Sequence, residues 1–352
     1  MHNVLVDLYK LGGNKYNGLY HFCYQLGHHL ATLPRMDDLA LSLYMPATSV
    51  GLFGNDVQYA IQKSRDKFYR FGTNKYDVWH VATTLSWYRP FNKKTRNVFT
   101  VHDLNFMEEP EYAIKSRKRY MDLIKQRINR ADHLTFISRF ALEQTKQYAD
   151  IGNKPYSIVY NGCNIPTSGD VKASPAYQPT APFLFSIGQL HWRKNFHVLP
   201  ALLKGNDFEL VIAGLKDFPY QETVMAAAKQ HGVEDRVKLV GPVTEAEKYW
   251  YYQNCQAFVF PSIGEGFGLP VLEAMHFGKP VFLSSYTSLP EVGGDAAYYF
   301  NDFDPAAMQL VFKQGMQHYR STQPVERIKQ HAAQFSWQKA AREYVAVYRS
   351  LL

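Results

Sequence analysis

The chain has 352 residues, enough for two domains, because a single hydrophobic core rarely grows beyond about 250–300 residues. Its 46% hydrophobic, 15% aromatic and 20% charged residues argue against a disordered protein, and no run approaches the roughly 18 apolar residues of a membrane span. Three widely separated cysteines exclude a disulfide scaffold and lack the spacing of a zinc site. The first residues lack the basic and apolar segments of a signal peptide, so we expect a cytoplasmic protein.

The formal charge of +8 belongs entirely to the first half of the chain. Residues 1–168 carry 22 Lys and Arg against 14 Asp and Glu, whereas residues 169–352 carry 17 of each kind. The densest basic cluster is 114–130, where seven basic residues surround apolar residues at helical spacing. Three interpretations stay open for it: a solvated helix packed on the core, a helix on an anionic membrane surface, or a contact with nucleic acid.

Residues 1–165 alternate between short apolar runs and segments with helical periodicity. The expected strands are residues 4–6, 39–44, 78–81, 98–101 and 134–137. The expected helices are residues 16–33, 57–71 and 138–148. Continuous apolar strands that alternate with helices are typical of a parallel sheet buried on both faces, so we expect a Rossmann-like N-terminal domain.

The alternation begins again after a proline-rich segment, residues 166–182, which we interpret as a linker. The expected strands are then residues 183–187, 209–213, 237–240, 257–260 and 281–283, with helices at 196–203, 222–231, 245–253 and 271–276. The chain is therefore expected to be an α/β protein with two doubly wound parallel-sheet domains, 1–165 and 183–335, that face a central cleft and bind ligands at the carboxyl ends of their strands. The amphipathic segment 336–352 can pack back on the N-terminal domain.

The segment 261–275 contains the most specific motif. A buried strand ends at Pro261, a loop with three glycines follows, and Pro270 occupies the first position of a predicted helix. Glycines let the backbone approach a ligand, and a helix start offers unpaired N–H groups to an anion. Glu265 in the loop and Glu273 in the first turns of the helix would then grip the hydroxyls of a phosphate-bearing ligand. The alternative is a tight turn with Glu273 complementing the helix dipole.

A second motif follows the first strand of the second half. Gly188 permits close approach of a ligand, and Arg193 and Lys194 stand at the start of the next helix. Two cations at a helix N-terminus oppose the dipole unless an anion binds there, so we expect a diphosphate between them and the amides of residues 266–269. The alternative is a pair of solvated surface cations.

Two features of the first half also lie where strands end. His102 and Asp103 follow a strand, where an imidazole can hydrogen-bond a ligand hydroxyl and a carboxylate can orient it, although a histidine satisfied within the junction is the alternative. Gly12 and Gly13 follow the first strand without the G-x-G-x-x-G pattern of a dinucleotide site, so either a ligand loop or a plain turn fits.

The triplet Asp302-Phe303-Asp304 has the D-x-D form of a metal-binding motif. Asp304 precedes Pro305 and a helical segment, which is the pattern of an N-cap followed by proline. We therefore interpret the triplet as a helix cap. No metal and no other cofactor is expected, since Arg193 and Lys194 are available to neutralise a diphosphate.

The order of these motifs closely resembles the retaining, GT-B-fold glycosyltransferases of family 4 (GT4, group 1), and the likeness covers nearly the full chain. The residues that carry it are Ile187-Gly188, Arg193-Lys194-Asn195, Ala213-Gly214, Val240-Gly241, Glu265 to Pro270, Glu273-Ala274, and in the first half Thr100 to Leu104, Ile137-Ser138 and Val159 to Gly162. The resemblance implies the GT-B fold, a nucleotide diphosphate-sugar donor and retention of the anomeric configuration.

The resemblance also implies a role for each matching residue. Glu273 would bind the donor ribose, Glu265 the donor sugar, and Arg193 with Lys194 the departing diphosphate, while His102 would lie near the C6 hydroxyl of the sugar. The backbone positions expected to contact the donor, including its base near Val240 and Gly241, are Gly12, Gly13, Gly188, Gly214, Val240, Gly241, Gly266, Phe267, Gly268 and Leu269.

The expected activity is transfer of a hexosyl group to a saccharide or lipid-linked saccharide in polysaccharide or lipopolysaccharide assembly. The stretch 102–104 resembles mannosyltransferase members, so GDP-mannose is the first expectation for the donor and a UDP-sugar the second. The helix 114–130 could place the protein at the inner face of a membrane, and no nucleic-acid partner is expected. A GT-B-like epimerase or phosphorylase and a non-catalytic binder of sugar or nucleic acid are the alternative functions.

Overall fold

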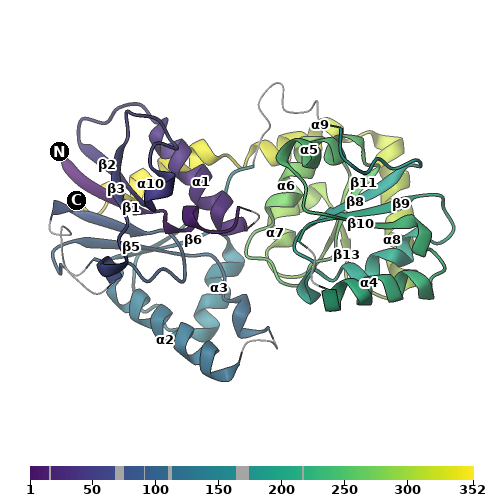
Figure 1. Ribbon diagram of the computed structural model, residues 1–352, viewed down its shortest axis with the longest axis horizontal. Helices are drawn as coiled ribbons and strands as arrows, with labels where there is room; N and C mark the ends of the chain where they lie inside the picture. Colours follow the sequence, from purple (N-terminus) through teal and green to yellow (C-terminus); the bar gives the residue numbers. More distant parts are fainter. Residues whose placement is uncertain (16, 68–74, 91, 110–112, 164–173, 216–217) are drawn as a thin grey trace. The chain divides into compact units, whose positions relative to one another are not determined.

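The computed structural model describes residues 1–352 except 16, 68–74, 91, 110–112, 164–173 and 216–217 (Figure 1). The chain divides into two compact units. Residues 1–162 and 336–352 form the N-terminal unit, and residues 163–335 form the C-terminal unit. Of the predicted linker 166–182, residues 166–173 lie outside the described part of the chain.

The N-terminal unit is built on a seven-stranded sheet with the order β3-β2-β1-β4-β5-β6-β7. Its strands are β1 (His2–Asp7), β2 (Leu39–Met45), β3 (Gln58–Ile61), β4 (Val78–Val81), β5 (Arg96–Val101), β6 (His133–Phe136) and β7 (Tyr156–Ile158). Neighbouring strands pair in parallel, and β1, β4 and β5 at the centre bury nearly every side chain. The strand order reverses between β1 and β4, which is the point where open parallel sheets usually bind ligands.

Helices cover both faces of this sheet (Figure 1). They are α1 (Gly18–Ala31), α2 (Ile114–Arg130), α3 (Arg139–Tyr148) and α10 (Trp337–Arg349), with short 3₁₀ turns η1 (Tyr9–Gly12), η2 (Ala47–Ser49), η3 (Ser64–Lys67) and η5 (Asn105–Met107). The side chains of Asn17 and Ser138 accept hydrogen bonds from Leu19 N and Ala141 N, and these N-caps explain where α1 and α3 begin.

The C-terminal helix α10 returns to the N-terminal unit and packs beside α1. The hydroxyl of Tyr348 lies 2.8 Å from Nδ1 of His80, whose Nε2 lies 2.7 Å from Oγ1 of Thr100. All three side chains are fully buried, so hydrogen bonds replace the water that they lose. Where α10 begins, a Cβ on Gly162 would lie 2.1 Å from the backbone nitrogen of Trp337, which requires glycine at that position.

The predicted helix 57–71 is wrong. Residues Gln58–Ile61 form β3, which pairs in parallel with β2, and Ser64–Lys67 form a 3₁₀ turn, while 68–71 lie outside the described residues. β3 is an edge strand with no fully buried side chain, so it lacks the apolar run that marks the central strands. Backbone pairing with β2 therefore outweighs the weak preference of these residues for a helix. The short edge strand β7 was likewise not expected.

The C-terminal unit contains a six-stranded parallel sheet with the order β10-β9-β8-β11-β12-β13. Its strands are β8 (Phe183–Ile187), β9 (Glu209–Ala213), β10 (Val237–Gly241), β11 (Ala257–Phe260), β12 (Val281–Ser284) and β13 (Tyr298–Phe300). Its helices are α4 (Phe218–Gln230), α5 (Glu245–Asn254), α6 (Leu269–His276), α7 (Leu289–Gly293), α8 (Pro305–Thr322) and α9 (Val325–Ala333), with 3₁₀ segments η6 (Trp192–Lys194), η7 (Phe196–Leu203), η8 (Glu234–Arg236) and η9 (Gly294–Ala296).

The predicted helix 196–203 is a 3₁₀ helix with Pro200 inside it. The predicted strands of this unit all form, and β13 at the sheet edge is an addition. Residues 174–182 pack in the C-terminal unit, where the hydroxyl of Tyr251 donates to the carbonyl of Tyr177 and the amide of Thr180 donates to Glu209.

Candidate functional site

The carboxyl ends of β8, β9 and β10 bring three of the predicted glycines together. Gly188 N donates to Ala213 O at 2.9 Å, and Gly214 N donates to Gly241 O at 2.8 Å. A Cβ on Gly214 would lie 1.8 Å from Gly188 O, and the φ angle of Gly214 is 141°, so only glycine fits there. Val240 is the next-to-last residue of β10 and directly precedes Gly241.

The loops that follow β8 and β11 interlock at this same edge of the sheet. The amide of Ile263 and the hydroxyl of Ser262 donate to Arg193 O, at 2.8 and 3.1 Å. A Cβ on Gly264 would lie 3.4 Å from Cβ and Cδ of Arg193, which places the aliphatic part of this side chain against the glycine loop. The hydroxyl of the fully buried Ser288 lies 3.0 Å from Glu265 O and 2.8 Å from Phe267 O. The loop after β12 is therefore hydrogen-bonded to the backbone of the glycine loop.

Lys194 and Glu265 form an ion pair in which each side chain is 12% exposed. Glu265 N also donates to Oγ1 of Thr287 at 3.3 Å, and Lys194 Nζ lies 5.2 Å from the centre of the Phe260 ring. Two of the predicted catalytic residues therefore contact each other directly. A ligand that binds Lys194 through a phosphate would compete with a carboxylate for the same ammonium group.

The predicted position of Arg193 and Lys194 at a helix N-terminus is wrong. Both belong to the single turn η6, which ends before Asn195 in the left-handed conformation, with φ 56°. The next helical segment, η7, begins only at Phe196. The helix-dipole argument therefore does not apply to these cations, and the glycine loop with its carboxylate is what surrounds them.

Helix α6 begins directly after the glycine loop. Its N-cap is Gly268, with φ 112°, and Pro270 is its second residue. A Cβ on Gly268 would lie 2.9 Å from Leu289 Cδ2, and the positive φ disfavours any other residue. A glycine cap brings no side-chain oxygen to the first amides of the helix, so a ligand anion can take that place.

Glu273 lies in the second turn of α6 and is 3% exposed. Its Oε1 accepts from Lys248 Nζ at 3.0 Å and its Oε2 accepts from the Tyr252 hydroxyl at 3.0 Å. Lys248 Nζ also donates to Glu245 Oε2 at 2.8 Å. Burial by itself would lower the pKa of Lys248, but the charges of Glu273 and Glu245 together outweigh burial and raise it above its ordinary value. Lys248 therefore stays charged in the interior.

Sequence reasoning missed Lys248 and Tyr252. The only signal was their spacing of four residues, which places them on the same face of α5. That face is buried, and a buried lysine on it requires an acidic partner.

In the N-terminal unit, His102 is buried at the end of β5. Its Nε2 donates to Ala82 O at 2.9 Å, its amide donates to Thr84 Oγ1 at 2.8 Å, and its ring packs edge-on against Phe22 at 4.4 Å. Burial lowers the pKa of His102, against the opposite effects of the Ala82 carbonyl and Asp103, so the ring is neutral at pH 7. With the proton on Nε2, Nδ1 is a hydrogen-bond acceptor.

Asp103 and the Gly12–Gly13 pair stabilise turns beside this strand edge. Oδ1 of Asp103 accepts from Asn105 N at 3.1 Å, and Gly13 N donates to Lys10 O at 2.9 Å. A Cβ on Gly12 would lie 2.8 Å from the side chain of Pro46, so this loop has no room for a larger residue.

Asp7 was not predicted, although it ends the buried strand β1 immediately before this loop. It is fully buried, accepts from the hydroxyl of Ser86, and accepts from Tyr9 N at 3.1 Å. Burial raises the pKa of Asp7 to about 7, although these hydrogen bonds and the charge of Arg127 lower it in part. A charged residue within the apolar pattern of β1 is the signal that could have identified it.

Arg127 does not lie on the solvent face of the basic helix, contrary to the sequence interpretation. It is 2% exposed, and its Nη2 donates to Ser86 O at 2.9 Å. Its position one turn after Ile124 and next to Ile128 places it on the face of α2 that packs against the core. The Asp7 carboxylate nearby partly offsets the cost of burying its charge.

The cap interpretation of Asp304 is confirmed. Its Oδ1 accepts from Ala306 N and Ala307 N, both at 3.0 Å, and α8 begins with Pro305. Within the described residues, no group of three or more His, Cys, Asp and Glu side chains could hold a metal ion. Over the same residues, every helix is too short or too polar to cross a bilayer.

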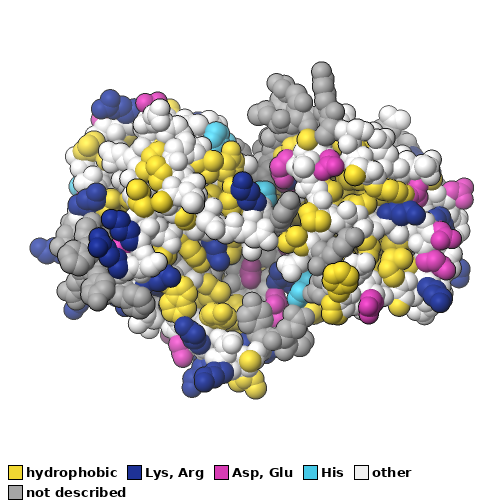
Figure 2. Space-filling view, in the orientation of Figure 1, with side chains coloured by type: hydrophobic (Ala, Val, Ile, Leu, Met, Phe, Trp, Pro, Cys, Tyr) yellow, Lys and Arg dark blue, Asp and Glu magenta, His cyan; other side chains and the backbone are white. Residues whose placement is uncertain are grey.

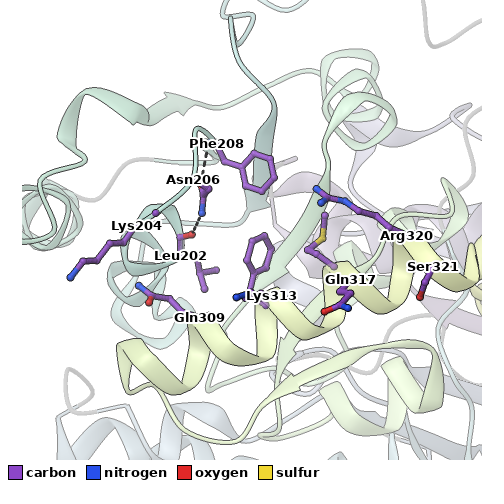
Figure 3. Close-up of a pocket in the computed structure, with 12 residues that line it drawn as sticks. Leu202, Lys204, Asn206, Phe208, Gln309, Lys313, Gln317, Arg320 and Ser321 are labelled. Carbon is purple, nitrogen blue, oxygen red and sulfur yellow. Dashed lines mark hydrogen bonds between the residues drawn. The ribbon is translucent and has the colours of Figure 1, made fainter.

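A cavity of about 760 Å³ in the C-terminal unit lies apart from these motifs, between residues 202–208 and α8 (Figure 3). Its lining includes the apolar side chains of Leu202, Phe208 and Phe312 and the basic side chain of Lys313. Asn206 and Gln309 donate to backbone carbonyls of η7, at 2.7 Å each. These two polar side chains of the cavity lining are therefore hydrogen-bonded to the protein backbone. None of the predicted donor-binding residues lines it.

Two family models match the chain, one after the other. Residues 28–165 match the model described as Glycosyltransferase Family 4, and residues 170–317 match Glycosyl transferases group 1. The chain is 29% identical over 276 residues to O-antigen chain mannosyltransferase B of Escherichia coli, which covers 73% of this chain and 71% of that protein. It is 26% identical to the serotype-specific mannosyltransferase WbdA of E. coli over 84% of this chain, but it spans only 37% of that longer protein.

Solved structures of low sequence identity share the fold over the full length. A sucrose-phosphate synthase from Thermosynechococcus elongatus superposes with a TM-score of 0.75 at 16% identity, covering 100% of this chain and 99% of that one. Anabaena HepE, solved in complex with UDP-glucose, superposes with a TM-score of 0.72 at 14% identity, covering 100% of both chains. With its two parallel-sheet α/β units, the protein has the GT-B fold and belongs to the family 4 (group 1) glycosyltransferases.

Proposed function

We propose that this glycosyltransferase moves a mannosyl group from GDP-mannose to a saccharide acceptor, with retention of configuration and without a metal ion. The relatives from E. coli are named as mannosyltransferases, and the one that covers 73% of this chain and 71% of its own length is named for the O-antigen chain. The acceptor is therefore proposed to be a growing surface polysaccharide or its lipid-linked precursor. A UDP-sugar is the second candidate for the donor.

The observation that carries this proposal is the meeting of Arg193, Lys194 and Glu265 at one edge of the C-terminal sheet. Arg193 lies against the glycine loop, and Lys194 is paired with Glu265. In the proposed complex, the donor diphosphate binds Lys194 and Arg193 and the first amides of α6. Glu265, released from Lys194, then accepts hydrogen bonds from the sugar hydroxyls. Such a site places positive charge where the leaving diphosphate develops negative charge.

In the proposed reaction, the bond between C1 of the sugar and the diphosphate oxygen breaks while the acceptor oxygen bonds to C1. The acceptor proton passes to the departing diphosphate on the same face of the sugar, so the configuration at C1 is retained. Arg193 and Lys194 stabilise the diphosphate charge, a task that a metal ion performs in other transferases. His102 is neutral and is therefore proposed to accept a hydrogen bond from a ligand hydroxyl through Nδ1 rather than to donate a proton.

The proposed acceptor is attached to a membrane lipid, and α2 is proposed to contact the anionic surface of that membrane. Five basic side chains of α2 are exposed, and Figure 2 shows Lys and Arg side chains on the visible face of this helix. They are Lys115, Lys118, Arg119, Lys125 and Arg130. Ile114 at the start of the helix is 84% exposed, and Arg119 lies 5.1 Å from the half-exposed ring of Trp87. Basic residues beside exposed apolar groups are typical of interfacial helices.

The membrane contact is tested by co-sedimentation with vesicles that contain increasing fractions of phosphatidylglycerol. Binding should rise with the anionic fraction, and Lys118→Glu with Arg119→Glu should reduce it, whereas Lys313→Glu in the C-terminal unit should not. Binding that is independent of the anionic fraction would exclude this role of α2.

The activity itself is tested by incubating the protein with GDP-mannose, UDP-glucose or ADP-glucose and measuring the shift in melting temperature. A ligand that binds the native state raises that temperature. NMR of the product formed with an acceptor saccharide reports the anomeric configuration, and addition of EDTA reports metal dependence. Conversion of the donor without an acceptor would indicate an epimerase, dependence on inorganic phosphate would indicate a phosphorylase, and binding without turnover would indicate a non-catalytic protein.

A further inference from the structure

Glu273 is held by two side chains of the neighbouring helix α5. Lys248 is 6% exposed, and its Nζ lies between Glu273 Oε1 at 3.0 Å and Glu245 Oε2 at 2.8 Å. Tyr252, which is fully buried, donates its hydroxyl to the other oxygen of the same carboxylate, Oε2, at 3.0 Å. Each oxygen of Glu273 therefore has its own donor from α5.

Packing alone does not account for this arrangement. Burying a lysine and a glutamate costs solvation that their attraction often fails to repay, and apolar residues of the same size would fill the space equally well. A carboxylate accepts up to about four hydrogen bonds, so the two bonds from α5 fix its plane without by themselves exhausting its capacity. An acceptor held in this way is suited to a pair of adjacent hydroxyls.

Several titratable groups surround Glu273 besides Lys248. Helix α5 contributes a second acid, Glu245, which shares Lys248 with Glu273. On the same helix, burial raises the pKa of Tyr249 and keeps the pKa of Tyr252 well above its usual range. Burial raises the pKa of Cys163, and the negative charge of Glu273 raises it further. On α6 itself, burial and the charge of Lys329 lower the pKa of His276, so this side chain is neutral at pH 7. The ammonium group of Lys248 contacts the Glu273 carboxylate directly.

We propose that Lys248 and Tyr252 are positioning residues that hold the Glu273 carboxylate aligned to bind the two ribose hydroxyls of the nucleotide donor. This inference rests on the proposed function, in which Glu273 contacts the ribose. Neither side chain touches the donor; Lys248 holds Oε1 of Glu273 and pairs with its charge, and Tyr252 holds Oε2. An acid buried without its cation takes up a proton more readily, and a protonated Glu273 accepts fewer hydrogen bonds.

The test measures the affinity for GDP, 2′-deoxy-GDP and 3′-deoxy-GDP by calorimetry between pH 5.5 and 8.5. The native protein should prefer GDP over both deoxy analogues at every pH. Lys248→Met keeps the length of the side chain and should weaken GDP binding about tenfold at pH 7, with a larger loss at pH 5.5 and a smaller one at pH 8.5. Tyr252→Phe should reduce the preference for GDP over its deoxy analogues without adding a pH dependence. In turnover assays, the donor KM should rise more than kcat falls.

The control variant is Lys329→Met. It removes an exposed ion pair with Glu326 that has the same i,i+3 spacing as the Lys248–Glu245 pair, and it should leave binding unchanged. Lys248→Met with Glu273→Gln contains no unpaired buried acid, so it should fold as the native protein does while losing the ribose preference and the added pH dependence. These effects distinguish a role in binding from a loss of stability.

Two results separate the failure of this inference from that of the proposed function. If Glu273→Ala binds GDP and the deoxy analogues as the native protein does, the ribose contact and the function built on it are wrong. If Glu273→Ala loses the ribose preference but Lys248→Met and Tyr252→Phe both retain native affinity, preference and pH dependence, the positioning role is wrong while the proposed function stands.

Discussion

Replacing Asp7 by asparagine is expected to change how the stability of the N-terminal unit depends on pH. Burial raises the pKa of Asp7 from 3.8 to about 7, against the lowering effects of Ser86, Tyr9 and Arg127. The folded protein therefore holds this proton more tightly than the unfolded chain does. The resulting stabilisation is complete below about pH 4 and is lost as the pH rises towards 7, by up to about 4 kcal/mol at 1.36 kcal/mol per pKa unit.

His80, on the neighbouring strand β4, should have the opposite effect. Burial, with a smaller effect of the His102 charge, lowers the pKa of His80 from 6.5 to about 3. Its contribution is therefore complete above about pH 6.5 and is lost as the pH falls towards 3. Between pH 4 and 6.5 the two groups oppose each other, so the native protein should show a shallower slope than either single variant.

The assay is guanidinium denaturation at half-unit steps from pH 4 to 8, with hydrogen exchange of the β1 and β4 amides as a local probe. Asp7→Asn should become more stable relative to the native protein as the pH rises, by about 1.4 kcal/mol per unit at the steepest part. His80→Gln should show the reverse trend. The exposed Asp235→Asn is the control. If the difference between Asp7→Asn and the native protein is constant from pH 4 to 7, the argument from burial is refuted.

Three further predictions concern the glycine edge, the proposed donor contacts and a helix cap. Gly214→Ala should lower the free energy of unfolding by more than about 3 kcal/mol, because its Cβ would lie 1.8 Å from a backbone oxygen, whereas Gly18→Ala, where no atom lies within 4 Å, should change it by less than about 1 kcal/mol. Arg193→Ala should mainly lower kcat, and Glu273→Ala should mainly raise the donor KM. Asp304→Ala should cost about 1 kcal/mol of stability through the loss of its two amide bonds.

Each of these has a contrary result. Equal stability of the two glycine variants in denaturant would show that the edge of the sheet tolerates a side chain at residue 214. Steady-state kinetics that change in neither Arg193→Ala nor Glu273→Ala would contradict the donor site. An unchanged melting temperature for Asp304→Ala would exclude the cap as a stabilising contact.

Local patterns were sufficient for much of the fold. Apolar runs predicted the central strands of both sheets, and the Asp304-Pro305 pair predicted the start of α8. The edge strand β3 could not be predicted because its side chains are largely exposed and its backbone bonds depend on β2. The clustering of the loops after β8 and β11 follows from a general property of parallel sheets, whose strand ends share one edge.

The candidate site shows the same division. The glycine loop, Arg193, Lys194, Glu265 and Glu273 were identified from motifs, but the motifs did not show that Lys194 pairs with Glu265. The helix-dipole argument for Arg193 and Lys194 was wrong because a left-handed Asn195 ends their turn before the next helix begins. A single left-handed residue is decided by the contacts of the loop, not by the composition around it.

By itself, the amino-acid sequence determined which segments become central strands, where several helices begin, and which loops have the glycines that a ligand needs, because these depend on periodicity and on the backbone preferences of single residues. Tertiary structure alone decided which distant side chains meet: Lys248 with Glu273 across 25 positions, Ser86 with Asp7 across 79, and Tyr348 with His80 across 268. Such pairs depend on which helix and strand faces come together, and no local pattern records that choice.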